Sequence, residues 1–197
     1  MNTANLKFFL AIAFLGLLSF SSNIQAQDKK IQPSQKASVT QFIGNDTEIT
    51  FTFSRPGVKG RKIYGGIVPF GMEPANKYSE KPFPWRAGAN ENTTIEVSTD
   101  VKIESQPLAA GKYSIHTIPG EKEWVVIFNK VNDQWGSYKY DEKMDALRIK
   151  VASQKAPFEE WLNYGFGDIT DNSTIAYFHW EKLKVPFKIE ISEQTTN

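Results

Sequence analysis

Apolar and polar residues alternate along most of this chain, and this pattern constrains the fold more than any other feature. In residues 183–191, Leu, Val, Phe and Ile occupy every second position and share one face. Residues 48–54 alternate in the same way, with hydroxyl side chains on the opposite face. A period of two is typical of half-buried antiparallel strands. The same pattern predicts further strands at 39–43, 93–98, 112–118, 124–129, 146–152 and 174–180.

Turn-forming residues separate these runs at 44–46, 106–111, 119–121, 132–133 and 171–173. One segment has two interpretations. Residues 157–164 begin with Pro and could form two helical turns, but they also alternate as far as Phe166, which favours a strand. Many short strands with turn breaks predict an all-β protein, an antiparallel β-sandwich that is jelly-roll-like and has at most one short helix.

The first residues have the three-part pattern of a secretory signal peptide. Lys7 precedes an uncharged apolar run over 8–20, and small residues lead to Ala26, where we expect cleavage. The run is too short to span a bilayer, so we expect an exported protein, periplasmic or secreted, without a membrane anchor after cleavage. We therefore expect a signal peptide at 1–26, a flexible leader at 27–36, a single β-sandwich domain at 37–192 and a C-terminal tail at 193–197.

Composition excludes several classes of function. Removing residues 1–26 removes one Lys from 23 basic residues, which leaves 22 against 22 acidic residues and gives no electrostatic basis for nucleic-acid binding. With no Cys, the chain has neither disulfides nor a cysteine nucleophile. The two His residues lack zinc-ligand spacing, and no calcium-loop, serine-hydrolase or nucleotide-loop motif is present. We therefore expect no metal and no cofactor.

Two loop-like stretches, 54–66 and 85–91, concentrate arginine and glycine. Arginine is a planar bidentate donor for carboxylate, phosphate or sulfate, and glycine lets backbone amides approach an anion. The alternative is structural: Arg86 or Arg55 could pair with Glu91 and clamp two loops, since buried charges must be paired. The candidate ligand-binding residues of these stretches are Arg55, Arg61, Trp85, Arg86, Asn90 and Glu91.

His116 is the main candidate for acid–base chemistry. It lies on the predicted strand 112–118, on the face shared by Ser114 and Ile118. As a general base it would need a nearby carboxylate such as Glu91 or Asp145, whereas a lone strand histidine is more often structural. His116 and Glu91 are thus weak catalytic candidates.

Aromatic residues favour a binding role. Trp124, Trp161 and Trp180 lie in alternating strands and are expected in the core. Trp85 and Trp135 lie beside turn-forming residues and could equally be exposed, where an indole ring can stack on a sugar. Trp135 joins the candidate ligand-binding residues on this ground.

A series of ordered motifs then connects the chain to a family. The motifs are Ser-Arg-Pro at 54–56, Lys-Gly-Arg at 59–61, Val-Pro-Phe-Gly at 68–71 and Trp-Arg-Ala-Gly-Ala-Asn-Glu-Asn-Thr at 85–93, with further matches at 110–120, 124–129 and 180–187. In these the chain resembles domain-of-unknown-function family 2911, a family of exported bacterial proteins, over about 36–190. The resemblance implies no established reaction. It also marks Met72–Pro84 as an insertion beside Trp85.

Three functional hypotheses follow, ranked in this order. The first is a non-catalytic binding module for an envelope glycan or a small anionic ligand. The second is a structural or assembly domain in which the arginines only clamp loops. The third is a hydrolase-like enzyme that uses Glu91 and His116, so catalysis is the less favoured expectation.

Overall fold

A computed structural model of the protein describes residues 31–192. The predicted signal peptide, residues 27–30 of the predicted leader and the predicted tail at 193–197 lie outside the described residues. The described residues from Gln32 onward belong to one compact unit. Among the described residues, no helix is long and apolar enough to cross a bilayer.

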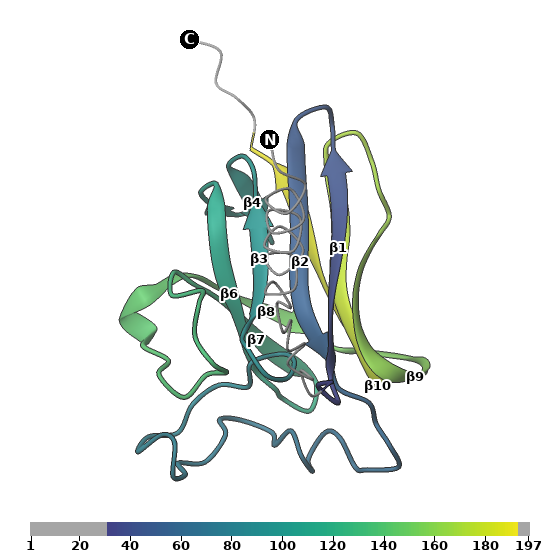
Figure 1. Cartoon of the computed structure of the whole chain (residues 1–197). Helices are drawn as coiled ribbons and strands as arrows, with labels where there is room; N and C mark the ends of the chain where they lie inside the picture. Colours follow the sequence, from purple (N-terminus) through teal and green to yellow (C-terminus); the bar gives the residue numbers. More distant parts are fainter. Residues whose placement is uncertain (1–30, 193–197) are drawn as a thin grey trace, which may run out of the picture. The chain divides into compact units, whose positions relative to one another are not determined.

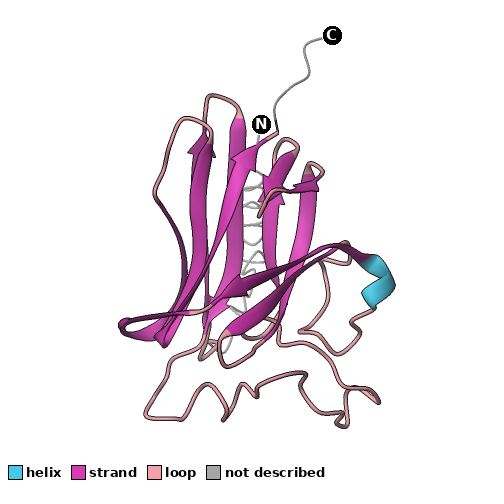
Figure 2. Ribbon diagram, turned by 180° about the vertical axis from the view of Figure 1, so that it is seen from behind, coloured by secondary structure: helices cyan, strands magenta, loops and turns pink. Residues whose placement is uncertain are grey.

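Two antiparallel sheets pack face to face and form an all-β sandwich, as the alternation predicts (Figures 1 and 2). The larger sheet has the strand order β1-β2-β3-β6-β7-β8. These strands are β1 (Gln35–Ile43), β2 (Thr47–Arg55), β3 (Thr93–Val97), β6 (Gly111–Ile118), β7 (Glu123–Asn129) and β8 (Asp145–Ala152). The smaller sheet has the order β5-β4-β10-β9, with β4 (Val101–Ile103), β5 (Gln106–Leu108), β9 (Gln154–Gly167) and β10 (Ser173–Ile191).

The core lies between the sheets and consists of the apolar positions of the alternating runs. In β10 the alternate residues Val185, Phe187 and Ile189 are buried, and Leu183 and Ile191 pack against the same core. Residues 157–164 belong to β9, so the strand interpretation of this segment is confirmed. Within residues 31–192 the single short helix is a 3₁₀ turn, η1 (Glu142–Met144).

Two expectations about strand boundaries were wrong. Residues 106–108 form β5, which follows a turn at Glu104–Ser105, where both residues have positive φ; only residues 109–110 of the predicted turn separate β5 from β6. Pro107 is tolerated because β5 is an edge strand, where a missing N–H breaks no ladder. The leader prediction extended too far, since β1 already begins at Gln35 and pairs with Arg55 of β2.

The two runs 174–180 and 183–191 form one strand rather than two. The register between β10 and β9 shifts around Glu181, which has φ 56°, so a bulge interrupts the alternation without ending the strand. This makes β10 a 19-residue strand that pairs with β9 along its first part and with β4 at its end.

Residues 56–92 cross one end of the sandwich, in blue to teal at the bottom of Figure 1. Their first part links the two sheets, because Val58 donates its N–H to the carbonyl of Glu160 in β9 and Leu162 of β9 donates to Pro56. The predicted long surface loop at 72–84 is a two-rung hairpin. Glu73 pairs with Phe83 and Asn76 with Ser79, each through two backbone hydrogen bonds. We call residues 72–84 the flap.

Candidate functional site

Trp85 anchors the motif that carries Arg86. Its backbone exchanges two hydrogen bonds of 2.8 Å with Thr117 at the end of β6, so residue 85 extends the larger sheet by one rung. Its indole ring stacks on Trp180 of the opposite sheet, with ring centroids 6.1 Å apart and planes 16° apart. Both rings are buried, so the position of Arg86 is set by the core itself.

The turn after Arg86 is fixed by buried hydrogen bonds. The carbonyl of Ala87 accepts from the Tyr164 hydroxyl of β9 at 2.8 Å and from Thr93 at 3.1 Å. A β-carbon on Gly88 would lie 2.6 Å from the Thr93 Oγ1, which explains why glycine is needed there. Ala87 and Asn90 both have positive φ, at 50° and 60°.

Asn90 closes this turn and orients Arg86. Its side-chain amide donates to the carbonyl of Ser34 at 2.9 Å, which ties the turn to the segment that leads into β1. Its own carbonyl accepts a hydrogen bond of 2.7 Å from Nη1 of Arg86. The Arg-x-Gly-Ala-Asn motif is therefore a turn in which the last residue fixes the guanidinium group of the first through a hydrogen bond.

The loop at residues 130–144, which we call the second loop, also contacts the Arg86 guanidinium. The group lies over the Tyr138 ring, 5.0 Å from its centroid, and against the backbone of Gly136, where a β-carbon would overlap it. Among the described residues, Arg86 forms no ion pair within 4.0 Å. Glu73 of the flap lies farther away: burial raises the pKa of its carboxyl, and the charge of Arg86 partly opposes that rise.

These side chains line a cleft of about 350 Å³ at the loop end of the sandwich. The flap contributes Glu73, Asn76 and Phe83 to its lining, and the second loop contributes Tyr138. The remaining lining residues include Ser34, Arg61, Ile67, Trp85, Arg86, Asn90 and Trp180. The cleft thus combines two guanidinium groups, one carboxyl group and several aromatic side chains.

Four of the seven predicted ligand-binding residues lie in this cleft, namely Arg61, Trp85, Arg86 and Asn90. Arg61 is also bound to its own loop, since its guanidinium donates to the carbonyls of Val58 and Gly57. Trp85 is only 6% exposed, because its ring is buried against Trp180.

The other three predicted residues lie elsewhere. Arg55 donates from Nε to the carbonyl of Leu162 in β9 and lines a separate depression beside Trp161. Glu91 is exposed and lines another depression with Lys36 and Lys112. Neither Arg55 nor Arg86 pairs with Glu91 among the described residues. The predicted ion-pair clamp is therefore wrong, and backbone carbonyls take its place.

The tryptophans divide differently from the expectation. Trp124 and Trp180 are buried as predicted, but Trp161 is 39% exposed on β9, where Lys59 lies over its ring. The bulge and edge position of β9 break the simple inside–outside pattern there. Trp135 is 55% exposed and is not among the residues that line the cleft, although it precedes Gly136.

His116 shares its sheet face with Ser114, as the strand pattern predicts, but it is completely buried. Its Nε2 lies 2.8 Å from the Ser114 hydroxyl and its Nδ1 lies 2.7 Å from the Ser137 hydroxyl. Burial lowers the pKa of His116 to about 4, an effect that the charge of Asp145 opposes and the charge of Arg86 reinforces. With both nitrogens occupied and Glu91 exposed to solvent, the structure does not bring the two catalytic candidates together as a pair.

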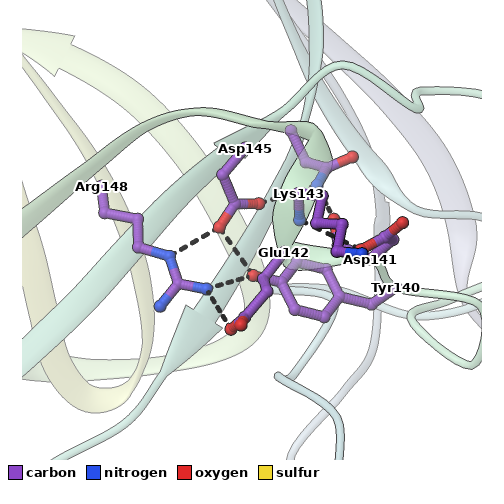
Figure 3. A network of polar contacts seen from close by, with 7 residues as sticks. Tyr140, Asp141, Glu142, Lys143, Asp145 and Arg148 are labelled. Carbon is purple, nitrogen blue, oxygen red and sulfur yellow. Dashed lines mark hydrogen bonds and ion pairs between the residues drawn. The ribbon is translucent and has the colours of Figure 1, made fainter.

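Figure 3 shows a polar network that includes Tyr140, Asp145 and Arg148. Tyr140 links this network to His116 through a ring contact. Asp145 accepts hydrogen bonds from Asn129, from the Tyr140 hydroxyl at 2.7 Å and from Arg148, while Tyr140 lies edge-on to His116. Arg148 also reaches Tyr140 and Glu142, as the dashed lines of Figure 3 show. Because Asp145 accepts from groups before, within and after the loop at 130–144, the network fixes this loop.

Sequence reasoning missed Glu73, Gly136 and Tyr138. The flap resembled an ordinary proline-rich loop, and nothing local shows that its hairpin returns to the cleft. Gly136, with φ 65°, sits in Trp-Gly-Ser-Tyr, which was a usable signal that this loop approaches another group closely. Within the described residues, no group of three or more His, Asp or Glu side chains could hold a metal ion.

Comparison with known proteins identifies the family. No curated protein and no solved structure matches this chain. The family described as "Protein of unknown function (DUF2911)" matches residues 34–189, which include every residue that lines the cleft. The chain therefore belongs to the DUF2911 family.

Proposed function

We propose that the protein is a non-catalytic binding module whose cleft takes a small anionic group, with Arg86 as the principal contact. One observation carries the proposal: Arg86 is half-buried in a cleft and its recorded hydrogen bond goes to a backbone carbonyl, not to a carboxylate. Removing a cation from water without a counter-charge is unfavourable. Glu73 also lines the cleft but forms no ion pair with Arg86 within 4.0 Å, so an anion in the cleft would supply a closer counter-charge.

The geometry around Arg86 supports an oriented site. Tyr138, Gly136 and the Asn90 carbonyl hold the guanidinium in one position, so little side-chain entropy remains to be lost when a ligand binds. A fixed guanidinium plane suits bidentate recognition of carboxylate or phosphate. Arg61 adds a second positive charge to the lining.

An anionic group fits this cleft better than a bare sugar ring. Stacking on a sugar needs a free aromatic face, but Trp85 is stacked on Trp180 and Tyr138 carries Arg86. Tyr138 also contacts Tyr78 and Phe83 of the flap. The predicted signal peptide supports export, and envelope components outside the cytoplasm that carry phosphate or carboxylate groups are then the ligands we propose.

A structural role is the second candidate, and the contacts of Arg55 and Arg61 favour it. Arg55 donates to a backbone carbonyl of β9 and so joins the two sheets, and Arg61 donates to backbone carbonyls of its own loop. Under this alternative Arg86 would only brace its own turn.

A thermal-shift experiment separates the two candidates. The probes are inorganic phosphate, glycerol phosphate and citrate, and the variants are Arg86→Gln and, as the matched control, Arg55→Gln. A ligand at a hundredfold excess over Kd stabilises the fold by about 2.7 kcal/mol, which raises Tm by roughly 5–10 °C for a domain of this size.

The binding proposal expects this shift in the wild type and in Arg55→Gln but not in Arg86→Gln. A wild type that none of the three anions stabilises, together with an early-melting Arg86→Gln, would establish the structural role instead.

A further inference from the structure

The loop end of the sandwich exposes an unusual concentration of large apolar side chains. Ile67, Phe70 and Met72 lie within six residues of one another, and all three are exposed. Tyr78 at the flap tip is 61% exposed, and Trp135 follows in the second loop. We call these five side chains, Ile67, Phe70, Met72, Tyr78 and Trp135, the apolar rim.

Contacts tie the apolar rim to the cleft. Ile67 belongs to the cleft lining, and the Tyr78 ring lies 5.1 Å from that of Tyr138, which carries Arg86. The Phe70 ring packs on Gly65 of the same segment, and Gly71 is anchored to Pro119 by a backbone hydrogen bond of 2.7 Å. Figures 1 and 2 show residues 56–92 as a layer across this one end of the sandwich.

The same segment is positively charged. Residues 56–92 contain six basic and three acidic residues, a net charge of +3, although the whole chain has a net charge of only +1. The bases Lys59, Arg61, Lys62, Lys77 and Lys81 are all exposed. Basic residues interspersed with exposed apolar side chains are the composition of surfaces that lie in a membrane interface.

We infer that the apolar rim docks on an anionic phospholipid surface, so that the cleft receives the phosphate of a lipid headgroup. The inference rests on the proposed function, because the anion at Arg86 is then part of a lipid. The apolar side chains would enter the interface, the surrounding lysines would face the headgroups, and the rest of the sandwich would stand away from the bilayer. This binding is peripheral and needs no membrane-spanning segment.

Two features favour a bilayer over a soluble polyanion. A polyanion needs bases alone and gives no reason to expose Ile67, Phe70 and Met72 together, since contiguous exposed apolar side chains mark interaction surfaces. Elsewhere in the described residues the exposed large apolar side chains are scattered; for example, Phe42 lies on β1, Phe158 on β9, Met144 in η1 and Ile169 after β9.

The test uses residues 27–197, which contain the whole described core, in sedimentation with vesicles. One set is phosphatidylcholine alone and the other contains phosphatidylglycerol as well. We expect binding to the anionic vesicles only, and weaker binding as salt is raised. The double variant Phe70→Ser/Met72→Ser should bind about tenfold more weakly. The matched control Phe42→Ser/Phe158→Ser should bind as the wild type does.

Soluble glycerol phosphate separates this inference from the proposed function. Phe70 and Met72 do not line the cleft, so the rim variant should keep the thermal shift that Arg86→Gln loses. A wild type that glycerol phosphate stabilises but that sediments with no vesicle overturns the inference and leaves the cleft as an anion site. Binding to an anionic polysaccharide and to no vesicle also overturns it. Absence of both the thermal shift and vesicle binding overturns inference and proposed function together.

Discussion

Gly136 provides the space that the Arg86 guanidinium occupies: a β-carbon on residue 136 would lie 2.6 Å from Nη1 of Arg86. The contact joins two loops that are 50 residues apart in sequence. Tyr138, two residues after Gly136, lies against the same guanidinium group, so the two residues together set its orientation in the cleft.

Replacing Gly136 with Ala should therefore displace Arg86 and abolish the thermal shift by phosphate. The side chain of Arg86 can move, so the stability loss should come mainly from the positive φ of residue 136, about 1 kcal/mol. Urea unfolding and the thermal shift measure the two effects separately. Gly71→Ala is the matched control, since Gly71 also has positive φ but has no atom within 4 Å of the added carbon. Equal loss of ligand response in both variants would contradict the role of Gly136.

His116 should make the fold sensitive to acid. Its pKa is about 4 in the folded protein and about 6.5 when unfolded, so the unfolded chain binds a proton first as pH falls. Stability should then decrease from about pH 6.5 down to about pH 4, by up to about 3 kcal/mol. Urea unfolding of wild type and His116→Gln at several pH values tests this. The variant should show a shallower decrease, and identical pH profiles would contradict the prediction.

Arg55 should matter for stability and not for binding. Its Nε–H bond to Leu162 joins the end of β2 to the opposite sheet. Arg55→Met keeps most of the aliphatic packing but removes the donor, which should cost about 1–2 kcal/mol. Chemical unfolding reports this loss, and the phosphate-induced rise in Tm should keep its wild-type size. A reduced rise would place Arg55 in the binding site after all.

Asp145 should control the order of the 130–144 loop. Its carboxylate accepts from Asn129, Tyr140 and Arg148, and an amide in its place would present a donor where only an acceptor fits (Figure 3). Asp145→Asn should cost about 2–3 kcal/mol and speed amide hydrogen exchange in this loop. Glu142→Gln is the control, because Glu142 is exposed and contacts Arg148 at 3.4 Å. Slow exchange retained in Asp145→Asn would refute this account of the loop.

Glu73 should make anion binding depend on pH. Burial raises the pKa of its carboxyl. As pH falls, this group therefore takes up a proton at a higher pH than an exposed Glu does. Loss of this negative charge strengthens the attraction of the cleft for an anion, and affinity should rise as pH falls through that pKa. Isothermal titration with phosphate analogues of constant charge tests the trend. Glu73→Gln should bind more tightly at neutral pH and show no such dependence.

Much of the fold could be predicted because the apolar residues that recur at every second position are the ones that the core buries. Residues 183–191 alternate cleanly, and the core takes up the side chains on the expected face. The prediction of strand boundaries failed where local backbone conformation, and not side-chain burial, determines where a strand ends. The Glu104–Ser105 turn uses positive φ in residues that rarely signal it, and Glu181 continues a strand through a bulge.

The cleft could be predicted only in part, for a related reason. Arg86 and Asn90 belong to one short motif, and their contact spans four residues. Glu73 and Tyr138 reach the cleft through tertiary packing of the flap and the second loop, which no local pattern encodes. His116 was placed on the right face, but its two serine partners include Ser137, which is 21 residues away.

The position of β10 at the centre of the smaller sheet also affects the order in which the protein can form. β9 and β4 have no neighbour in common except β10, the last of the described strands. A chain that grows from its amino terminus can pair β4 with β5 early, but β9 has no strand partner in its sheet until Ser173–Ile191 has emerged. The smaller sheet therefore closes only after Ser173–Ile191 has been made, and until then β9 and the β4–β5 pair remain separate in this sheet.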